Sequence, residues 1–163
     1  MFKALRDKFR RLGRDEDGAA LVEMALITPF MLVLSAGVFE FSNVLHTRLL
    51  IEAGVEDAAR YIARCSDTWA NCSAYGKNLA VNASVTGGTA RVSGWTTSQV
   101  TVSSSSFPAM DASGNELYLS SAGAVTVVQV SASYPYVGTG LWTILGFGNL
   151  SITASHQERV IGW

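Results

Sequence analysis

Cysteine and histidine are scarce in this chain of 163 residues, which holds two of each. Cys65 and Cys72 are spaced too widely for a C-x-x-C redox pair, and both histidines lie far from them in the sequence, which argues against a zinc site. Serine is plentiful, but no G-x-S-x-G motif is present, and no glycine-rich segment carries the lysine of a phosphate-binding loop. The sequence therefore predicts no enzyme, no bound metal and no cofactor.

Charge is also scarce outside the N-terminus. Six of the twelve basic residues stand in the first fourteen positions, and no basic patch recurs in the rest of the chain, so nucleic-acid binding is not expected. From Ala19 to Phe39 the only charged residue is Glu23. About 20 apolar residues are enough for a helix to cross a bilayer, and a carboxylate inside such a segment suggests a function. We therefore expect a cytoplasmic leader over 1–18 and a transmembrane helix over 19–41.

The position of the basic cluster predicts an orientation. Lys and Arg that directly precede an apolar span hold that end in the cytoplasm, so residues 65–163 are expected on the other side of the membrane. An oxidising compartment favours disulfides, and the even cysteine count there predicts a bridge between Cys65 and Cys72. The interpretation is a single-pass protein of the bacterial inner membrane with a periplasmic domain. An ordinary secretory signal, cut near Gly37, remains an alternative.

The helical pattern continues past the apolar span. Apolar residues recur at helical spacing up to Arg64, with polar residues between them, which predicts an amphipathic continuation over 42–64. This continuation needs another element on which to bury its apolar face. The apolar positions are Phe41, Leu45, Leu49, Val55, Ala59 and Ile62.

Residues 65–163 read as an extracytoplasmic β domain. A short helix over Ser73–Ala83 is followed by three runs with partial period-two alternation, Ala90–Val102, Ala124–Tyr134 and Leu150–Ile161. The expected class is α+β: a long N-terminal helix packed on a small antiparallel sheet. The loop from Asp111 to Glu116 is rich in oxygen ligands and is either a hairpin turn or a calcium loop. The apolar cluster Leu141–Phe147 is either part of the core or a partner surface.

The sequence around Gly18 resembles the cleavage site of type IV prepilins. Gly18-Ala19-Ala20-Leu21-Val22-Glu23 places a glutamate five residues after the glycine. The wider pattern resembles the TadE-like family, the pilin-like proteins of the tight adherence (Flp) pilus system. It consists of Gly18 to Leu26, then Pro29, Phe39-Glu40-Phe41 and Ala58-Ala59-Arg60-Tyr61. Met24 departs from it, because an aromatic residue usually follows the glutamate.

The resemblance implies a minor pilin or pseudopilin of a tight adherence type IV pilus. Its partners would be a prepilin peptidase that cuts after Gly18, the other pilins and pseudopilins, and the inner-membrane assembly platform. Cleavage would leave a free amine on Ala19, about 6 Å along the helix axis from Glu23. Glu23 and Ala19 would then form subunit contacts in the assembly. An uncleaved single-pass membrane protein with a protein-binding outer domain is the alternative.

Overall fold

The computed structural model describes residues 16–120, 123–138, 140, 146 and 150–161. Two compact units divide the chain, one up to Ser42 and one from Asn43 onward, which we call the head. The basic cluster at positions 3–14 and, apart from Gly146, the apolar cluster Leu141–Phe147 lie outside the described residues. The expectations that concern them stay predictions.

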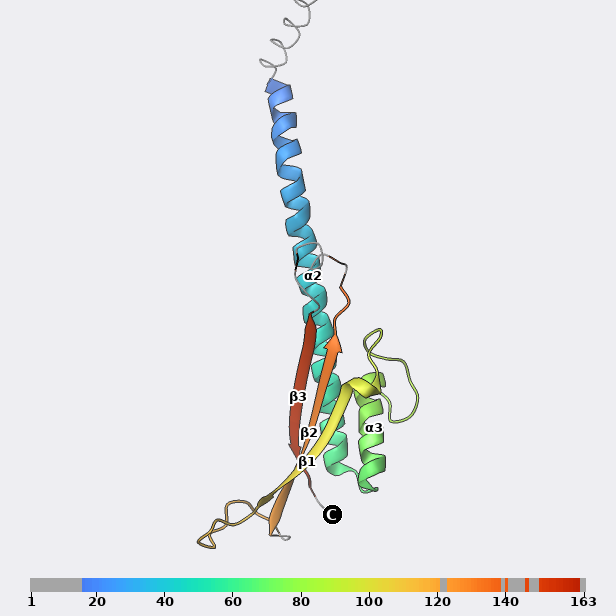
Figure 1. Cartoon of the computed structure of the whole chain (residues 1–163), viewed down its shortest axis with the longest axis vertical. Helices are drawn as coiled ribbons and strands as arrows, with labels where there is room; N and C mark the ends of the chain where they lie inside the picture. The colour runs from blue at the N-terminus through green and yellow to red at the C-terminus, as the bar shows by residue number, and fades with distance from the viewer. Residues whose placement is uncertain (1–15, 121–122, 139, 141–145, 147–149, 162–163) are drawn as a thin grey trace, which may run out of the picture. The chain divides into compact units, whose positions relative to one another are not determined.

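A single helix, α2, extends over 49 residues from Glu16 to Arg64 and contains Pro29 without interruption (Figure 1). This confirms the long helix predicted from the sequence, which begins three residues earlier than expected. Arg64 in the last turn places a positive charge where the helix dipole favours one. After a short loop, α3 spans Trp69–Asn82 and contains Cys72; it begins a few residues before the predicted Ser73–Ala83.

The head contains a three-stranded antiparallel sheet in the order β1-β2-β3. β2 (Ala124–Pro135) is central, between β1 (Val100–Pro108) and β3 (Ser151–Arg159) (Figure 1). Val130 marks the register, because it stands opposite Val102 on one side and His156 on the other. The predicted α+β class is confirmed, and β2 and β3 lie within two residues of their predicted bounds.

The first predicted strand is misplaced. It was expected over Ala90–Val102, but the structure has a short 3-10 helix at Thr97–Gln99 and the strand only from Val100. Gly94 has a φ of 80°, a backbone conformation that breaks a strand. Trp95 next to it is 2% exposed. This apolar residue therefore inserts its side chain into the core and does not belong to a strand.

The core of the head lies between the sheet and α2. It includes the predicted positions Val55, Ala59 and Ile62, but not the other three. Leu45 and Leu49 are 44% and 63% exposed, whereas Ile51 is fully buried. Leu49 and Ile51 are two positions apart, which on a helix of 3.6 residues per turn turns their side chains by about 200°. The expectation that Leu45 and Leu49 face the core is therefore wrong, and Phe41 is exposed as well. The face that packs on Val128 and Val130 contains Ile51, Val55, Ala58, Ala59 and Ile62.

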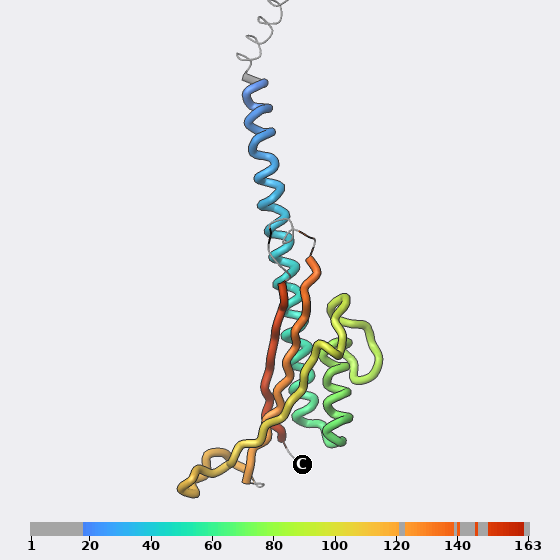
Figure 2. Tube along the Cα trace, viewed as in Figure 1, coloured from blue at the N-terminus to red at the C-terminus, as the bar shows by residue number. Residues whose placement is uncertain are grey.

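Two glycines let α2 and α3 approach each other closely (Figure 2). A Cβ on Gly54 would lie 2.4 Å from the Ala80 carbonyl oxygen and 2.9 Å from the Trp95 ring. A Cβ on Gly76 would lie 2.4 Å from the Ile62 side chain. Glycine has a low helix propensity, but at position 54 it is required because a side chain there would clash with α3.

Candidate functional site: the start of α2 and its exposed faces

The residues singled out at the prepilin-like motif all lie at the start of α2. Gly18 and Ala19 lie near the beginning of the described part of α2, and Glu23 follows one turn after Ala19. Gly18 is half-buried, whereas Ala19 and Glu23 are exposed.

The apolar part of α2 is uncovered. Within unit one, every side chain from Ala19 to Ala36 is exposed, and the large residues Leu21 and Phe30 are each 72% exposed. An 18-residue window in this helix has a mean hydropathy of 2.0 and no buried residue, so α2 is a candidate membrane span by length and composition. A helix that is apolar on all sides is stable in lipid or among other helices, because water solvates it poorly.

Polar side chains in this part of α2 bond to the helix itself. The Thr28 hydroxyl donates to the Met24 carbonyl at 2.6 Å, and the Ser35 hydroxyl donates to the Met31 carbonyl at 2.8 Å. Each hydroxyl is thereby satisfied within its own helix, as hydrocarbon surroundings require. Glu23 is the one ionisable side chain of the Ala19–Phe39 segment. A carboxylate is costly in hydrocarbon without a partner, so Glu23 is the residue of this segment that most needs one.

A second exposed apolar feature lies within the head. Leu45, Leu49 and Ala53 are exposed at four-residue intervals along α2, and we call them the α2 stripe. Arg48 pairs with Glu52 at 2.8 Å beside the stripe, on the solvent side of the helix. Because the opposite face of α2 is already buried in the core, the stripe is available to a partner.

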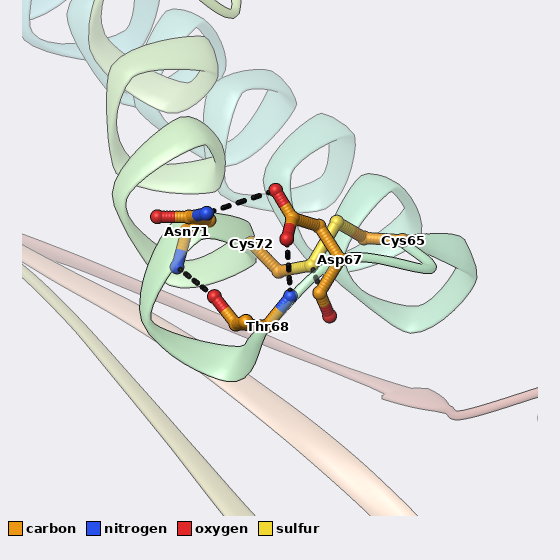
Figure 3. Close-up of a disulfide and its surroundings, with 5 residues drawn as sticks. All are labelled: Cys65, Asp67, Thr68, Asn71 and Cys72. Atoms are coloured by element: carbon orange, nitrogen blue, oxygen red, sulfur yellow. Dashed lines mark hydrogen bonds between the residues drawn. A yellow bond between two sulfur atoms is a disulfide. The ribbon is translucent and has the colours of Figure 1, made fainter.

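The predicted disulfide is confirmed and joins α2 to α3. Cys65 and Cys72 are bonded, with their Cα atoms 5.9 Å apart, and the short loop between them is held by side chains (Figure 3). Asp67 accepts hydrogen bonds from the Thr68 amide at 2.6 Å and from the Asn71 side chain at 2.9 Å. These bonds, the Thr68 amide first, lower the pKa of the Asp67 carboxyl. Thr68 in turn caps α3 by accepting from the Asn71 amide.

The two histidines lie on different elements. His46 is exposed on α2, and His156 on β3 lies 3.4 Å from Glu158. Among the residues that the structure describes, no three His, Cys, Asp or Glu side chains come together to hold a metal ion. The loop of Asp111 is a hairpin connection, in which the Asp111 carboxylate accepts from the Ser113 and Asn115 amides at 2.8 Å.

The roles of Gly18 and Glu23 stay predictions, and the predicted disulfide is confirmed, but sequence reasoning missed the α2 stripe. The signal was present, because Leu45 and Leu49 are apolar at helical spacing, but it was assigned to the core. Buried Thr47 and Gly54 mark the true core face, and neither is a hydrophobic residue that a pattern search counts.

Comparison with known proteins supports the resemblance found at the start of α2. Residues 18–60 match the model of the family described as TadE-like protein. The match begins at Gly18 and ends four residues before the end of α2, so it covers about a quarter of the chain. A comparison with curated proteins and one with solved structures gave no match.

Proposed function

From the TadE-like match of residues 18–60, we propose that this chain is a minor pilin or pseudopilin in the assembly of a tight adherence type IV pilus. The match indicates a pilin-like protein associated with a Tad pilus, in a structural rather than an enzymatic role. The observation that carries the proposal is that the match begins at Gly18, directly before an apolar helix whose one charge is Glu23. Its partners would be a prepilin peptidase, the other pilins and pseudopilins, and the assembly platform.

The proposed setting is the bacterial inner membrane. α2 would cross it over 19–41, with the basic leader 1–18 in the cytoplasm and the head in the periplasm. Two observations support this orientation. Half of the chain's Lys and Arg precede the span, and the head contains a disulfide, which oxidising compartments favour.

The proposed processing step is hydrolysis of the Gly18–Ala19 peptide bond by the peptidase. The leader 1–18 leaves with a new carboxyl group on Gly18, and Ala19 becomes the N-terminus with a free amine. The amine and the Glu23 carboxylate are opposite charges in an apolar environment, where a pair is far more favourable than either charge alone. A Glu23 carboxylate that reaches the Ala19 amine of a neighbouring subunit would set the register between subunits.

The α2 stripe is a further support for assembly. Leu45, Leu49 and Ala53 offer an apolar helical surface that the head itself leaves open. A pilin that stays alone in the periplasm would gain nothing from keeping this surface exposed to water. A neighbouring subunit with an apolar helix would cover it.

The mature N-terminus tests the proposal against its alternatives. Protein is extracted from its native membrane and its intact mass is measured. A chain that starts at Ala19 supports the proposal, one that starts at Met1 supports the uncleaved membrane protein, and one that starts near Gly37 supports a secreted domain. A Gly18→Trp variant serves as the control, since a large side chain next to the bond should leave the chain at full length.

A further inference from the structure

The hairpin between β1 and β2 ends in an ordered apolar surface. Five large apolar residues stand out there: Phe107, Met110, Leu117 and Tyr118 are 51–57% exposed, and Leu119 is 83% exposed. We call residues 107–119 the hairpin tip. Backbone bonds fix its conformation, from the Asp111 amide to the Asn115 carbonyl at 2.9 Å and from the Leu117 amide to the Ala109 carbonyl at 2.7 Å. The tip is thus a formed surface, and its exposed apolar side chains suggest a binding partner.

A groove of about 620 Å³ lies at the other end of the sheet. Its apolar walls include Leu50, Val92 and the rings of Tyr134 and Tyr136. The Tyr134 hydroxyl donates to the Ser93 carbonyl at 2.8 Å, which fixes this ring as part of the wall. Tyr136 is likewise held, because its hydroxyl accepts from the Asn43 side chain at 2.9 Å.

The tip and the groove belong to opposite ends of one strand. β2 begins at Ala124, next to the hairpin tip, and ends at Pro135, which lines the groove. Twelve residues of strand span about 40 Å at 3.3 Å per residue. A tip therefore cannot reach the groove of its own head, but it can reach the groove of another copy.

The tip is acidic, and the groove carries hydrogen-bond donors. The tip contains Asp111 and Glu116 and no Lys or Arg. Among the described residues, the groove is lined by Arg91 and His46 and by no acidic side chain. Asp57 pairs with Arg91 at 2.5 Å and offsets part of its charge, whereas the Arg91 Nε atom is buried without a hydrogen-bond partner among the described residues. The Glu116 carboxylate of a neighbouring copy would add a hydrogen-bond acceptor to a groove whose Arg91 and His46 side chains are donors.

We propose that the hairpin tip of one copy docks in the groove of the next. Such a contact joins two different surfaces, and it propagates from copy to copy when all copies point the same way. Two antiparallel copies that exchanged tips would instead close into a dimer, and the double variant would then give covalent dimers but no ladder. This inference deepens the proposed function, because it supplies a head-to-head contact for an assembly that would otherwise depend on α2 alone. The contact and the proposed pilus role would both be excluded only if copies of the chain did not associate with each other at all.

Cysteine cross-linking of the full chain in detergent tests the contact. The native cysteines are paired, so a new cysteine reacts with another new one. Leu119→Cys represents the tip and Ser93→Cys the groove, since Ser93 is exposed and lines it. On mild oxidation we expect a covalent dimer from the mixture of the two variants, no dimer from either alone, and a ladder of oligomers when both changes are in one chain. Ser104→Cys, exposed in the middle of β1, replaces Ser93→Cys as the matched control.

Each other outcome overturns the proposal. Dimers from Leu119→Cys alone would mean that tips meet tips in a closed dimer, and absence of cross-links in the mixture would mean that tip and groove do not meet. Charge exchange gives an independent measurement. Glu116→Lys should lower the yield of the mixed dimer several-fold, and adding His46→Glu on the groove partner should restore it. Because purified full-length chain is used, a negative result leaves the processing proposal standing, and the mature mass decides that one separately.

Discussion

The same substitution at three glycines should have three different effects on the head, because their surroundings differ. Gly54→Ala places a Cβ 2.4 Å from the Ala80 carbonyl oxygen and 3.2 Å from its carbon, which are backbone atoms of α3. Overpacking typically costs about 1–3 kcal/mol, and we expect the upper end here, since no side chain can rotate away. Alanine returns about 1 kcal/mol of helix propensity over glycine. The expected net destabilisation is about 2 kcal/mol.

Gly76→Ala and Gly37→Ala are the comparisons. The Gly76 Cβ would meet the Ile62 side chain, whose outer atoms can turn aside, so its cost should be smaller than at Gly54. The Gly37 Cβ would meet nothing within 4 Å, so the stability of the head should not change. Urea unfolding of full-length chain in detergent, followed by near-ultraviolet circular dichroism, measures all three. With a slope of about 2 kcal/mol per M urea, the Gly54→Ala midpoint should fall by about 1 M.

A particular result would refute this reasoning. If Gly54→Ala and Gly37→Ala had equal midpoints, α3 would not lie against α2 as described, or it would shift without cost. If Gly76→Ala were the most destabilising of the three, the backbone contact at Gly54 would not be the limiting one. Either outcome would also weaken the account of why glycine interrupts an otherwise good helix sequence.

Four further outcomes are expected. Glu23→Gln should leave membrane insertion intact and reduce the number of pili counted by electron microscopy, and a normal count would make the carboxylate incidental. Leu49→Lys should abolish assembly while the unfolding free energy of the head stays within about 0.5 kcal/mol of the parent, whereas Ile51→Lys, two positions along, should unfold it. Thr68→Ala removes the cap of α3 and should cost about 0.5–1 kcal/mol in the same assay, at the low end because its hydrogen bond is 3.4 Å long. The lowered pKa of Asp67 contributes stability that is present above its unfolded pKa of 3.8 and is lost as pH falls below that value, so Asp67→Asn should flatten the acid limb of the stability profile.

The elements that the sequence predicts well are those whose signals are local. The apolar run after Gly18 and the following helical periodicity identify α2, and the valines of β2 favour a strand, with partial period-two alternation. The two cysteines identify their own bridge. The misplaced strand has a different cause, because Trp95 is buried by contact with Gly54, 41 positions earlier in the chain. No local pattern records a contact of that kind.

The face of α2 shows the same limit at the candidate site. Leu45 and Leu49 look like core residues when only their hydrophobicity and spacing are considered. The core instead takes the side of α2 that contains Gly54 and Ala58, because small residues let α3 and Trp95 approach the helix axis. Leucines at those positions would hold α3 away, so the larger residues had to go elsewhere.

α2 therefore has two apolar faces within the head. We expect the buried face to serve folding and the exposed face to serve assembly. The face with Ile51 and Val55 is buried, and changes there should act on the stability of the head. The α2 stripe is exposed, and an apolar surface of this kind is costly in water unless a partner covers it. A chain selected only to fold would keep polar residues at Leu45 and Leu49, as it does at the adjacent Arg48 and Glu52. That leucines stand there instead is a reason, independent of Gly18 and Glu23, to expect another subunit against this helix.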